Sequence, residues 1–236
     1  MLANLLSSEP STMQILQLIL AIPCIIIALS FHEAAHGYAA YKMGDPTARN
    51  LGRLTLNPIK HLDLFGSLMM LIVGYGWAKP VPINTRYFKD QKKGMAISAL
   101  AGPLTNFALG IMGLLLTRTV LVICYTDAVY AAIMQNNTLY SFITALILLL
   151  DTFALYNFSF AVFNMIPIPP FDGSRVLFAF LPDKYYFGIM QYERYIMIAV
   201  LLFFTVGPGF SISSIVGGIT TLFDNLFDLI PFLRIG

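Results

Sequence analysis

The chain has 236 residues, of which 58% are hydrophobic and only 11% charged, whereas soluble domains carry about 25% charged residues. With a mean hydropathy of +0.75, this composition excludes an ordinary soluble protein. The formal net charge of +2, without a basic tract, argues against a nucleic-acid partner. We therefore expect an all-α polytopic membrane protein with about five or six transmembrane segments in a lipid bilayer. Residues 1–13 lack a basic region, so no cleaved signal peptide is expected.

The first expected span, Met13 to Tyr41, contains the motif His32-Glu33-Ala34-Ala35-His36. Histidines four residues apart on a helix leave the same face and can share one tetrahedral Zn²⁺. Glu33 is placed to accept a proton from a water molecule activated by that metal. Three ionisable residues at membrane depth are costly unless they bind an ion, pair, or line a water path. The motif therefore favours a zinc hydrolase over a chance match or a structural polar cluster.

The segment after this span is rich in positive charge. It holds nine of the fourteen Lys and Arg residues: Lys42, Arg49, Arg53, Lys60, Lys79, Arg86, Lys89, Lys92 and Lys93. The positive-inside rule makes it cytoplasmic and places the N-terminus outside. Within it, the apolar run Leu62 to Trp77 predicts a re-entrant or short β hairpin. The two prolines of Lys79 to Asn84 indicate extended edge structure, because proline suits neither a helix interior nor a central strand.

Two further full spans are expected at Met95 to Cys124 and at Leu139 to Asn164. The last quarter holds two shorter apolar segments, Tyr195 to Val206 and Ser213 to Ile230, which could form a hairpin. In this topology His32 and Asp172 both fall near the cytoplasmic face.

A catalytic zinc site needs a third protein ligand, and His61, Asp63 and Asp172 are the candidates. Asp172 is favoured because it shares the depth of the histidines and follows a rigid Pro-rich turn. His61 is more typical of a structural or supporting histidine. Asn106 lies at membrane depth, where its amide could stabilise an oxyanion or make an interhelical hydrogen bond.

Several motifs in a fixed order resemble the site-2 protease family of intramembrane zinc metallopeptidases, especially its small members without a PDZ-like or other regulatory domain. They are His32 to His36, Gly44 to Ala48, Gly52 to Pro58 with His61 and Asp63, Trp77 to Pro82, Ala101 to Asn106, and Asn164 to Gly173. The resemblance covers the first three-quarters of the chain and implies one zinc ion per chain, bound by His32, His36 and Asp172. It implies Glu33 as general base and Asn106 as oxyanion donor.

The expected function is hydrolysis of peptide bonds within or near transmembrane segments of other membrane proteins. Residues 1–236 are interpreted as one membrane-embedded peptidase domain. Its location would be a bacterial-type cell membrane, with the active site near the cytoplasmic side. Val81, Ile83 and Asn84 are a hypothetical edge for an unwound substrate. A transporter or channel, and a catalytically inactive binding or chaperone-like membrane protein, remain the alternatives.

Overall fold

The computed structural model describes residues 12–63, 65–66, 78–206 and 213–234, and every regular element in these ranges is helical. The chain thus has the expected all-α character, and no strand occurs among the described residues. Most of the hairpin expected at Leu62 to Trp77 lies outside them. Lys79 to Asn84 has no regular secondary structure, so the expected β hairpin is not shown.

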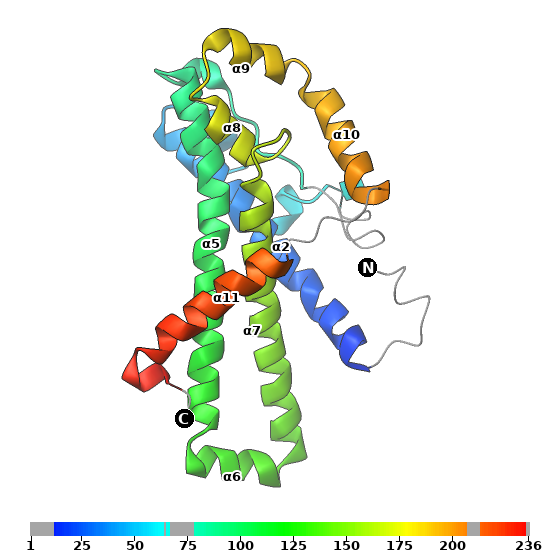
Figure 1. The fold of residues 1–236 in the computed structure, drawn as a ribbon, viewed down its shortest axis with the longest axis vertical. Coiled ribbons are helices and arrows are strands. Elements are labelled where there is room, and N and C mark those ends of the chain that lie inside the picture. The colour runs from blue at the N-terminus through cyan, green and yellow to red at the C-terminus, as the bar shows by residue number, and fades with distance from the viewer. Residues whose placement is uncertain (1–11, 64, 67–77, 207–212, 235–236) are drawn as a thin grey trace.

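Three long helices form the body of the molecule: α2 (Thr12–Lys42), α5 (Gln91–Cys124) and α7 (Asn137–Asn164). Each is long and apolar enough to cross a membrane. They match the expected spans to within four residues at each end. Figure 1 shows α5 and α7 running side by side along the long axis, with α2 crossing them obliquely.

Polar caps explain where two of these helices begin. The Asp90 side chain accepts a hydrogen bond from the backbone N–H of Lys93 at the start of α5. The Asn136 side chain accepts from the backbone N–H groups of Thr138 and Leu139 at the start of α7. Both caps satisfy helix donors that would otherwise lack partners, and they add a turn that apolar periodicity alone does not reveal.

The remaining helices are short. They are α3 (Thr47–Asn50), η1 (Pro58–Lys60), η2 (Thr85–Tyr87), α6 (Asp127–Gln135), α8 (Asp172–Phe178), α9 (Asp183–Met190), α10 (Glu193–Val206), α11 (Ser213–Asp228) and η3 (Pro231–Leu233). With 14 and 16 residues, α10 and α11 fall short of the roughly 20 needed to cross a bilayer. The structure therefore shows three candidate spans in its described part, not five or six.

One apolar face of α11 packs against other helices, whereas Ile215, Leu222 and Leu226 are exposed. Figure 1 shows α11 lying across α5 and α7, and its Phe223 contacts the rings of Phe107 and Phe158. Phe158 is fully buried, and a Cβ added at Gly110 would come within 2.8 Å of its ring. Small residues allow membrane helices to approach closely in this way.

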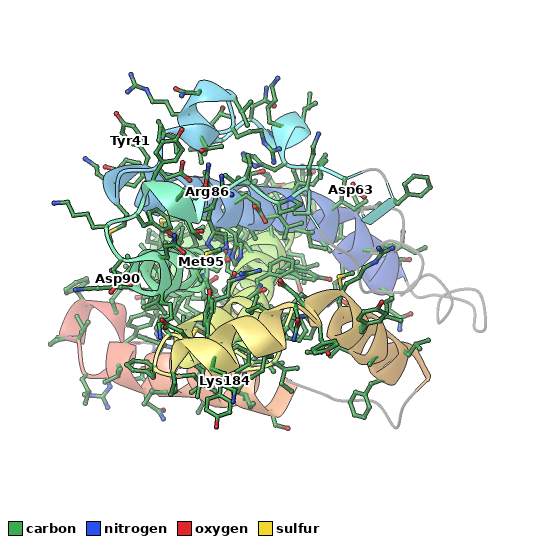
Figure 2. The ribbon with its side chains drawn as sticks, turned by 90° about the horizontal axis from the view of Figure 1, so that it is seen from above. Tyr41, Asp63, Arg86, Asp90, Met95 and Lys184 are labelled. Atoms are coloured by element: carbon green, nitrogen blue, oxygen red, sulfur yellow. The ribbon has the colours of Figure 1, made fainter. Side chains whose placement is uncertain are left out.

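The end of the molecule where α2 finishes and α5 begins is rich in polar side chains. Figure 2 looks down on this end and shows Arg86 and Asp90, which lie just before and at the start of α5, together with Lys184 of α9. The helix α8 packs against α5 here, which brings the turn after α7 over the second half of α2.

Candidate metal centre

The two histidines of the motif lie on one face of α2, and each is fixed through its Nδ1 atom. Nδ1 of His36 donates to the backbone carbonyl of Ser98 at 2.8 Å. Nδ1 of His32 donates to Oδ1 of Asn106 at 2.5 Å. Because both Nδ1 atoms carry the ring proton, both Nε2 atoms present a lone pair in the neutral ring.

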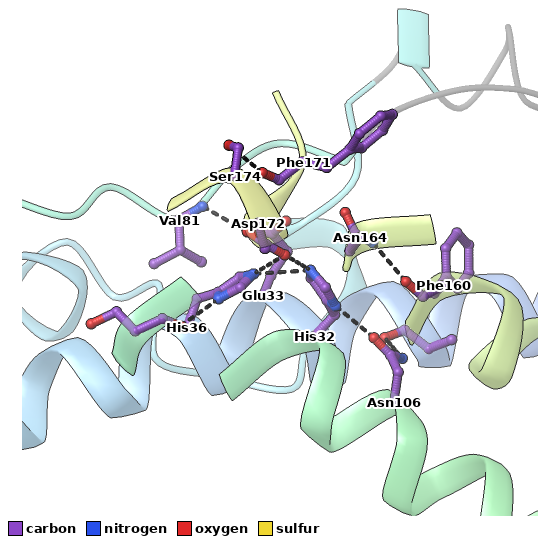
Figure 3. Close-up of polar contacts among 12 residues, drawn as sticks. His32, Glu33, His36, Val81, Asn106, Phe160, Asn164, Phe171, Asp172 and Ser174 are labelled. Carbon is purple, nitrogen blue, oxygen red and sulfur yellow. Dashed lines mark hydrogen bonds and ion pairs between the residues drawn. The ribbon is translucent and has the colours of Figure 1, made fainter. Parts of the chain in front are cut away.

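Asp172 is the first residue of α8, directly after the Pro-rich turn that follows α7. Its Oδ2 lies 3.1 Å from Nε2 of His32 and 3.3 Å from Nε2 of His36. The two Nε2 atoms are 2.9 Å apart, so one acceptor atom from each of the three residues meets at one point (Figure 3). The structure brings together the three residues expected to bind metal, from segments 140 positions apart.

Three converging acceptors repel one another unless a cation lies between them. Zinc bonds of about 2.0–2.2 Å in tetrahedral geometry place neighbouring ligand atoms roughly 3.3–3.5 Å apart. The observed separations of 2.9, 3.1 and 3.3 Å are close to this spacing. The donor set of two imidazoles and one carboxylate also suits zinc. The residues present therefore fit a zinc ion.

The charge state of Asp172 agrees with a ligand role. Burial raises the pKa of this carboxyl. In the metal-free protein the His36 and His32 rings, when they carry a proton on Nε2, outweigh burial and hold the pKa below its usual range, and a cation in place of those protons acts in the same direction. Asp172 is therefore ionised at neutral pH and offers a carboxylate oxygen to a cation.

Gly102 of α5 makes room for this cluster. A Cβ added there would lie 2.5 Å from Cε1 and Nε2 of the His36 ring and 2.7 Å from Cε1 of His32. The backbone of α5 lies directly against both imidazole rings, and only a glycine at position 102 allows the rings to come this close to the helix.

Glu33 also faces this centre, and an extended backbone segment holds its carboxylate. The N–H of Val81 donates to Oε2 of Glu33 at 2.8 Å (Figure 3). The Val81 side chain is buried against Gly37, where an added Cβ would come within 3.1 Å of Cγ1. One oxygen of Glu33 is thus anchored by the backbone of the extended segment.

Two buried charged side chains fix this extended segment on either side of Val81. Nη2 of Arg53 donates to the carbonyls of Lys79 and Pro80 at 2.8 and 3.3 Å. Oδ2 of the fully buried Asp45 accepts from the backbone N–H of Asn84 at 2.6 Å. Lys79 to Asn84 is therefore held by these side chains and by one backbone hydrogen bond, from the N–H of Lys79 to the carbonyl of His61 at 2.8 Å, and no strand ladder occurs in it.

The other residues singled out from the sequence have definite surroundings. His61 is buried and contacts the carbonyl of Thr55 through Nε2 at 2.7 Å, outside the three-residue cluster. Asp63 accepts from the backbone N–H of Gly66. Ile83 is half-buried in the extended segment. These contacts give His61 and Asp63 local structural partners.

Sequence reasoning missed four supporting groups: the Ser98 carbonyl, Arg53, Asp45, and Asn157, whose Oδ1 accepts from Nδ2 of Asn106 at 2.9 Å. The sequence Asp45-Pro46-Thr47 is typical of a turn and could have indicated the role of Asp45. In the structure, Oδ1 of Asp45 accepts from the backbone N–H of Thr47 at 2.9 Å, as in such turns. The others act through partners distant in sequence, and no local pattern marks them.

The comparisons with known proteins agree with this geometry. Residues 20–207 match the sequence profile described as "Peptidase family M50". The chain is 38% identical over 185 residues to "Putative zinc metalloprotease YwhC" of Bacillus subtilis, covering 78% of this chain and 80% of the relative.

More distant relatives carry a related name. "Putative zinc metalloprotease Rip2" of Mycolicibacterium smegmatis is 30% identical over 167 residues, which are 67% of this chain and 56% of that protein. The protein of that name from Mycobacterium tuberculosis strain H37Rv is 25% identical, over 76% of this chain and 64% of the relative. No solved structure matches the chain. The profile match and the identity to YwhC confirm the expected resemblance: the chain belongs to peptidase family M50, the site-2 protease family.

Proposed function

We propose that the protein is an integral membrane zinc endopeptidase that hydrolyses peptide bonds within or near transmembrane segments of other membrane proteins. One observation carries the proposal. The lone pairs of His32 and His36 and the carboxylate of Asp172 converge on one point, directly beside Glu33. Three acceptor atoms that converge on one point form a binding site for a cation. The adjacent carboxylate of Glu33 can accept a proton from a water molecule that the cation activates. The family and the names of the relatives support zinc as the metal and proteolysis as the reaction.

The proposed ligands are His32, His36 and Asp172, with one zinc ion per chain. Zinc held there supplies Lewis acidity, which polarises a carbonyl and makes water nucleophilic near neutral pH. Glu33 takes a proton from the attacking water and delivers it to the leaving amine. Because Val81 anchors Oε2, the proton is held at Oε1 of Glu33, on the side away from the extended segment.

The oxyanion role of Asn106 stays a prediction. Its Nδ2 donates to the carbonyl of Ala28 at 3.1 Å and to Oδ1 of Asn157 at 2.9 Å. Donation to a developing oxyanion requires Asn106 to release one of these two bonds during the reaction.

The substrate-binding role of Val81, Ile83 and Asn84 is likewise a proposal. A helical substrate hides its carbonyls in its own hydrogen bonds and must unwind before it can be cleaved. An unwound chain can pair with exposed backbone of the extended segment. The buried Val81 side chain and its N–H already have partners, which leaves Ile83 as the contact point on this segment.

The proposed membrane placement follows the charge asymmetry of the chain. The basic segment between α2 and α5 lies on the cytoplasmic side, the N-terminus lies outside, and the metal centre lies near the cytoplasmic face of a bacterial-type membrane. Water reaches the site from that side, and residues 1–236 form a single peptidase domain.

The proposal is tested with purified protein and a model single-span substrate in detergent or vesicles. We expect cleavage by the parent protein, loss of cleavage with a zinc chelator, and recovery when zinc is returned. Glu33→Gln should abolish cleavage while keeping one zinc per chain, because it removes the proton acceptor and leaves the three ligands intact. Full cleavage by Glu33→Gln, or active protein without bound metal, would contradict the proposal.

A further inference from the structure

Asn157 is a fully buried amide in the last third of α7, and its hydrogen bonds go to neither the metal ligands nor Glu33. Its Nδ2 donates to the carbonyl of Phe153, one turn earlier, at 2.8 Å. Its Oδ1 accepts from Nδ2 of Asn106 at 2.9 Å. A polar group at this depth in a membrane helix is costly, so its partners define what it does.

These hydrogen bonds have one possible direction. Because Nδ2 of Asn157 is used by Phe153, its Oδ1 must face Asn106 and can only accept. Asn106 must therefore present Nδ2 on that side, where it also donates to the carbonyl of Ala28. Its Oδ1 is left facing Nδ1 of His32.

The opposite orientation of Asn106 is unfavourable at every contact. Its Oδ1 would then face two acceptors, the Ala28 carbonyl and Oδ1 of Asn157, and its Nδ2 would face the N–H of His32. Buried groups without a complementary partner cost about 1–3 kcal/mol each. Asn157 and the Ala28 carbonyl thus together select the orientation of Asn106, and Asn106 selects the ring nitrogen of His32 that carries the proton.

We propose that Asn157 is a positioning residue of the metal centre, which acts through Asn106 to keep the proton of His32 on Nδ1. Nε2 of His32 then keeps its lone pair for the cation beside His36 and Asp172. The inference rests on the proposed function in naming zinc as that cation. It assigns a role in metal affinity to a residue of α7, a helix that supplies no ligand.

If the hydrogen bond between Asn106 and Asn157 only held α5 and α7 together, its loss would lower the stability of the protein without changing which nitrogen of His32 carries the proton. Groups that orient a metal-bound histidine typically change metal affinity 10- to 100-fold when removed. We expect a loss of this size for Asn157→Ser. Serine bonds back to the preceding turn, as Ser159 already does to the Leu155 carbonyl at 2.7 Å, and is too short to reach Asn106.

The experiment compares three variants with the parent protein. Asn157→Ser removes the acceptor. Asn157→Asp, in its protonated form, donates to the Phe153 carbonyl and keeps an acceptor oxygen toward Asn106. Ser159→Ala removes a polar group from a half-buried position of α7. Zn²⁺ affinity is measured by competition with a chromophoric chelator. Nitrogen NMR of the metal-free protein reports the protonated nitrogen of each ring, and the chain has only three histidines. Asn157→Leu, similar in volume and without an acceptor, replaces Asn157→Ser should the latter not fold.

We expect Asn157→Ser to bind Zn²⁺ 10- to 100-fold more weakly and to lose the fixed Nδ1–H signal of His32. Asn157→Asp should recover most of the affinity, and Ser159→Ala should match the parent. The inference is overturned if Asn157→Ser keeps parental affinity and ring signals, or if Asn157→Asp binds as weakly as Asn157→Ser. A parent protein without Zn²⁺ affinity would instead overturn the proposed function, and the ring signals would still decide the role of Asn157.

Discussion

Gly102 shows how strongly a single residue limits this centre. The His32 and His36 rings rest on the α5 backbone at a distance that leaves no space for a Cβ. Both rings are also tied at Nδ1, to Asn106 and Ser98, so they cannot retreat without breaking a buried hydrogen bond. A methyl group at this position must therefore displace the ligands, the helix, or both.

Gly102→Ala should consequently weaken metal binding. Overpacking a well-packed interior costs about 1–3 kcal/mol, which corresponds to roughly a 5- to 150-fold loss of Zn²⁺ affinity. Chelator competition measures this loss, and cleavage should fall with zinc occupancy. Gly218→Ala in α11 is the matched control, because an added Cβ there meets nothing within 4 Å. If Gly102→Ala bound Zn²⁺ as tightly as the parent protein, the His32 and His36 rings would be able to move aside without losing the metal, and the prediction would be wrong.

At the scale of elements, the extended segment from Lys79 to Asn84 sets the position of the general base. Arg53 holds the carbonyls before Val81, and Asp45 holds the backbone N–H of Asn84 after it. The N–H of Val81 is thereby presented to Glu33. The position of the carboxylate depends on a segment that belongs to no helix.

Arg53→Gln should therefore lower the rate of cleavage more than it lowers metal content. Loosening the carbonyls of Lys79 and Pro80 lets Val81 and Glu33 shift, and a misplacement of about 1 Å can cost up to 100-fold in rate. We expect kcat to fall about 10- to 100-fold with zinc still bound. Arg86→Gln, at an exposed position near the same segment, should leave kcat unchanged. Equal kcat for both variants would remove Arg53 from the catalytic geometry.

The sequence predicts the features that are set by residues close together in the chain, and it does not predict those that depend on contacts between distant residues. The long helices follow from continuous apolar runs, and the metal ligands from spacing along α2 together with a rigid turn before Asp172. The bonds that Asn106, Asn157 and Arg53 make to other elements could not be predicted, because they join residues from 26 to 78 positions apart. The extended segment was expected to be a strand edge, but it is fixed by the side chains of Arg53, Glu33 and Asp45 and by one backbone bond from Lys79 to His61.

At the scale of the whole molecule, the ligands come from two segments that only helix packing brings together. His32 and His36 belong to α2, whereas Asp172 follows α7 and begins α8. The helix α5 lies between these segments and contacts α2, α7 and α8. A cation bound here crosslinks the start and the later part of the described chain, so its binding energy also stabilises this packing.

Zinc should accordingly raise the thermal stability of the purified protein in detergent. An ion that binds only the folded state adds about 2.7 kcal/mol when its free concentration is 100 times its Kd. Asp172→Asn removes the carboxylate of one segment, so the zinc-dependent rise in Tm should disappear or shrink sharply. Asp183→Asn removes an exposed acid that pairs with Lys92 at 2.9 Å, so the rise should persist. If Asp172→Asn kept the full rise, the cation would bind without joining the two segments, because Asp172 is the ligand that links α8 to α2.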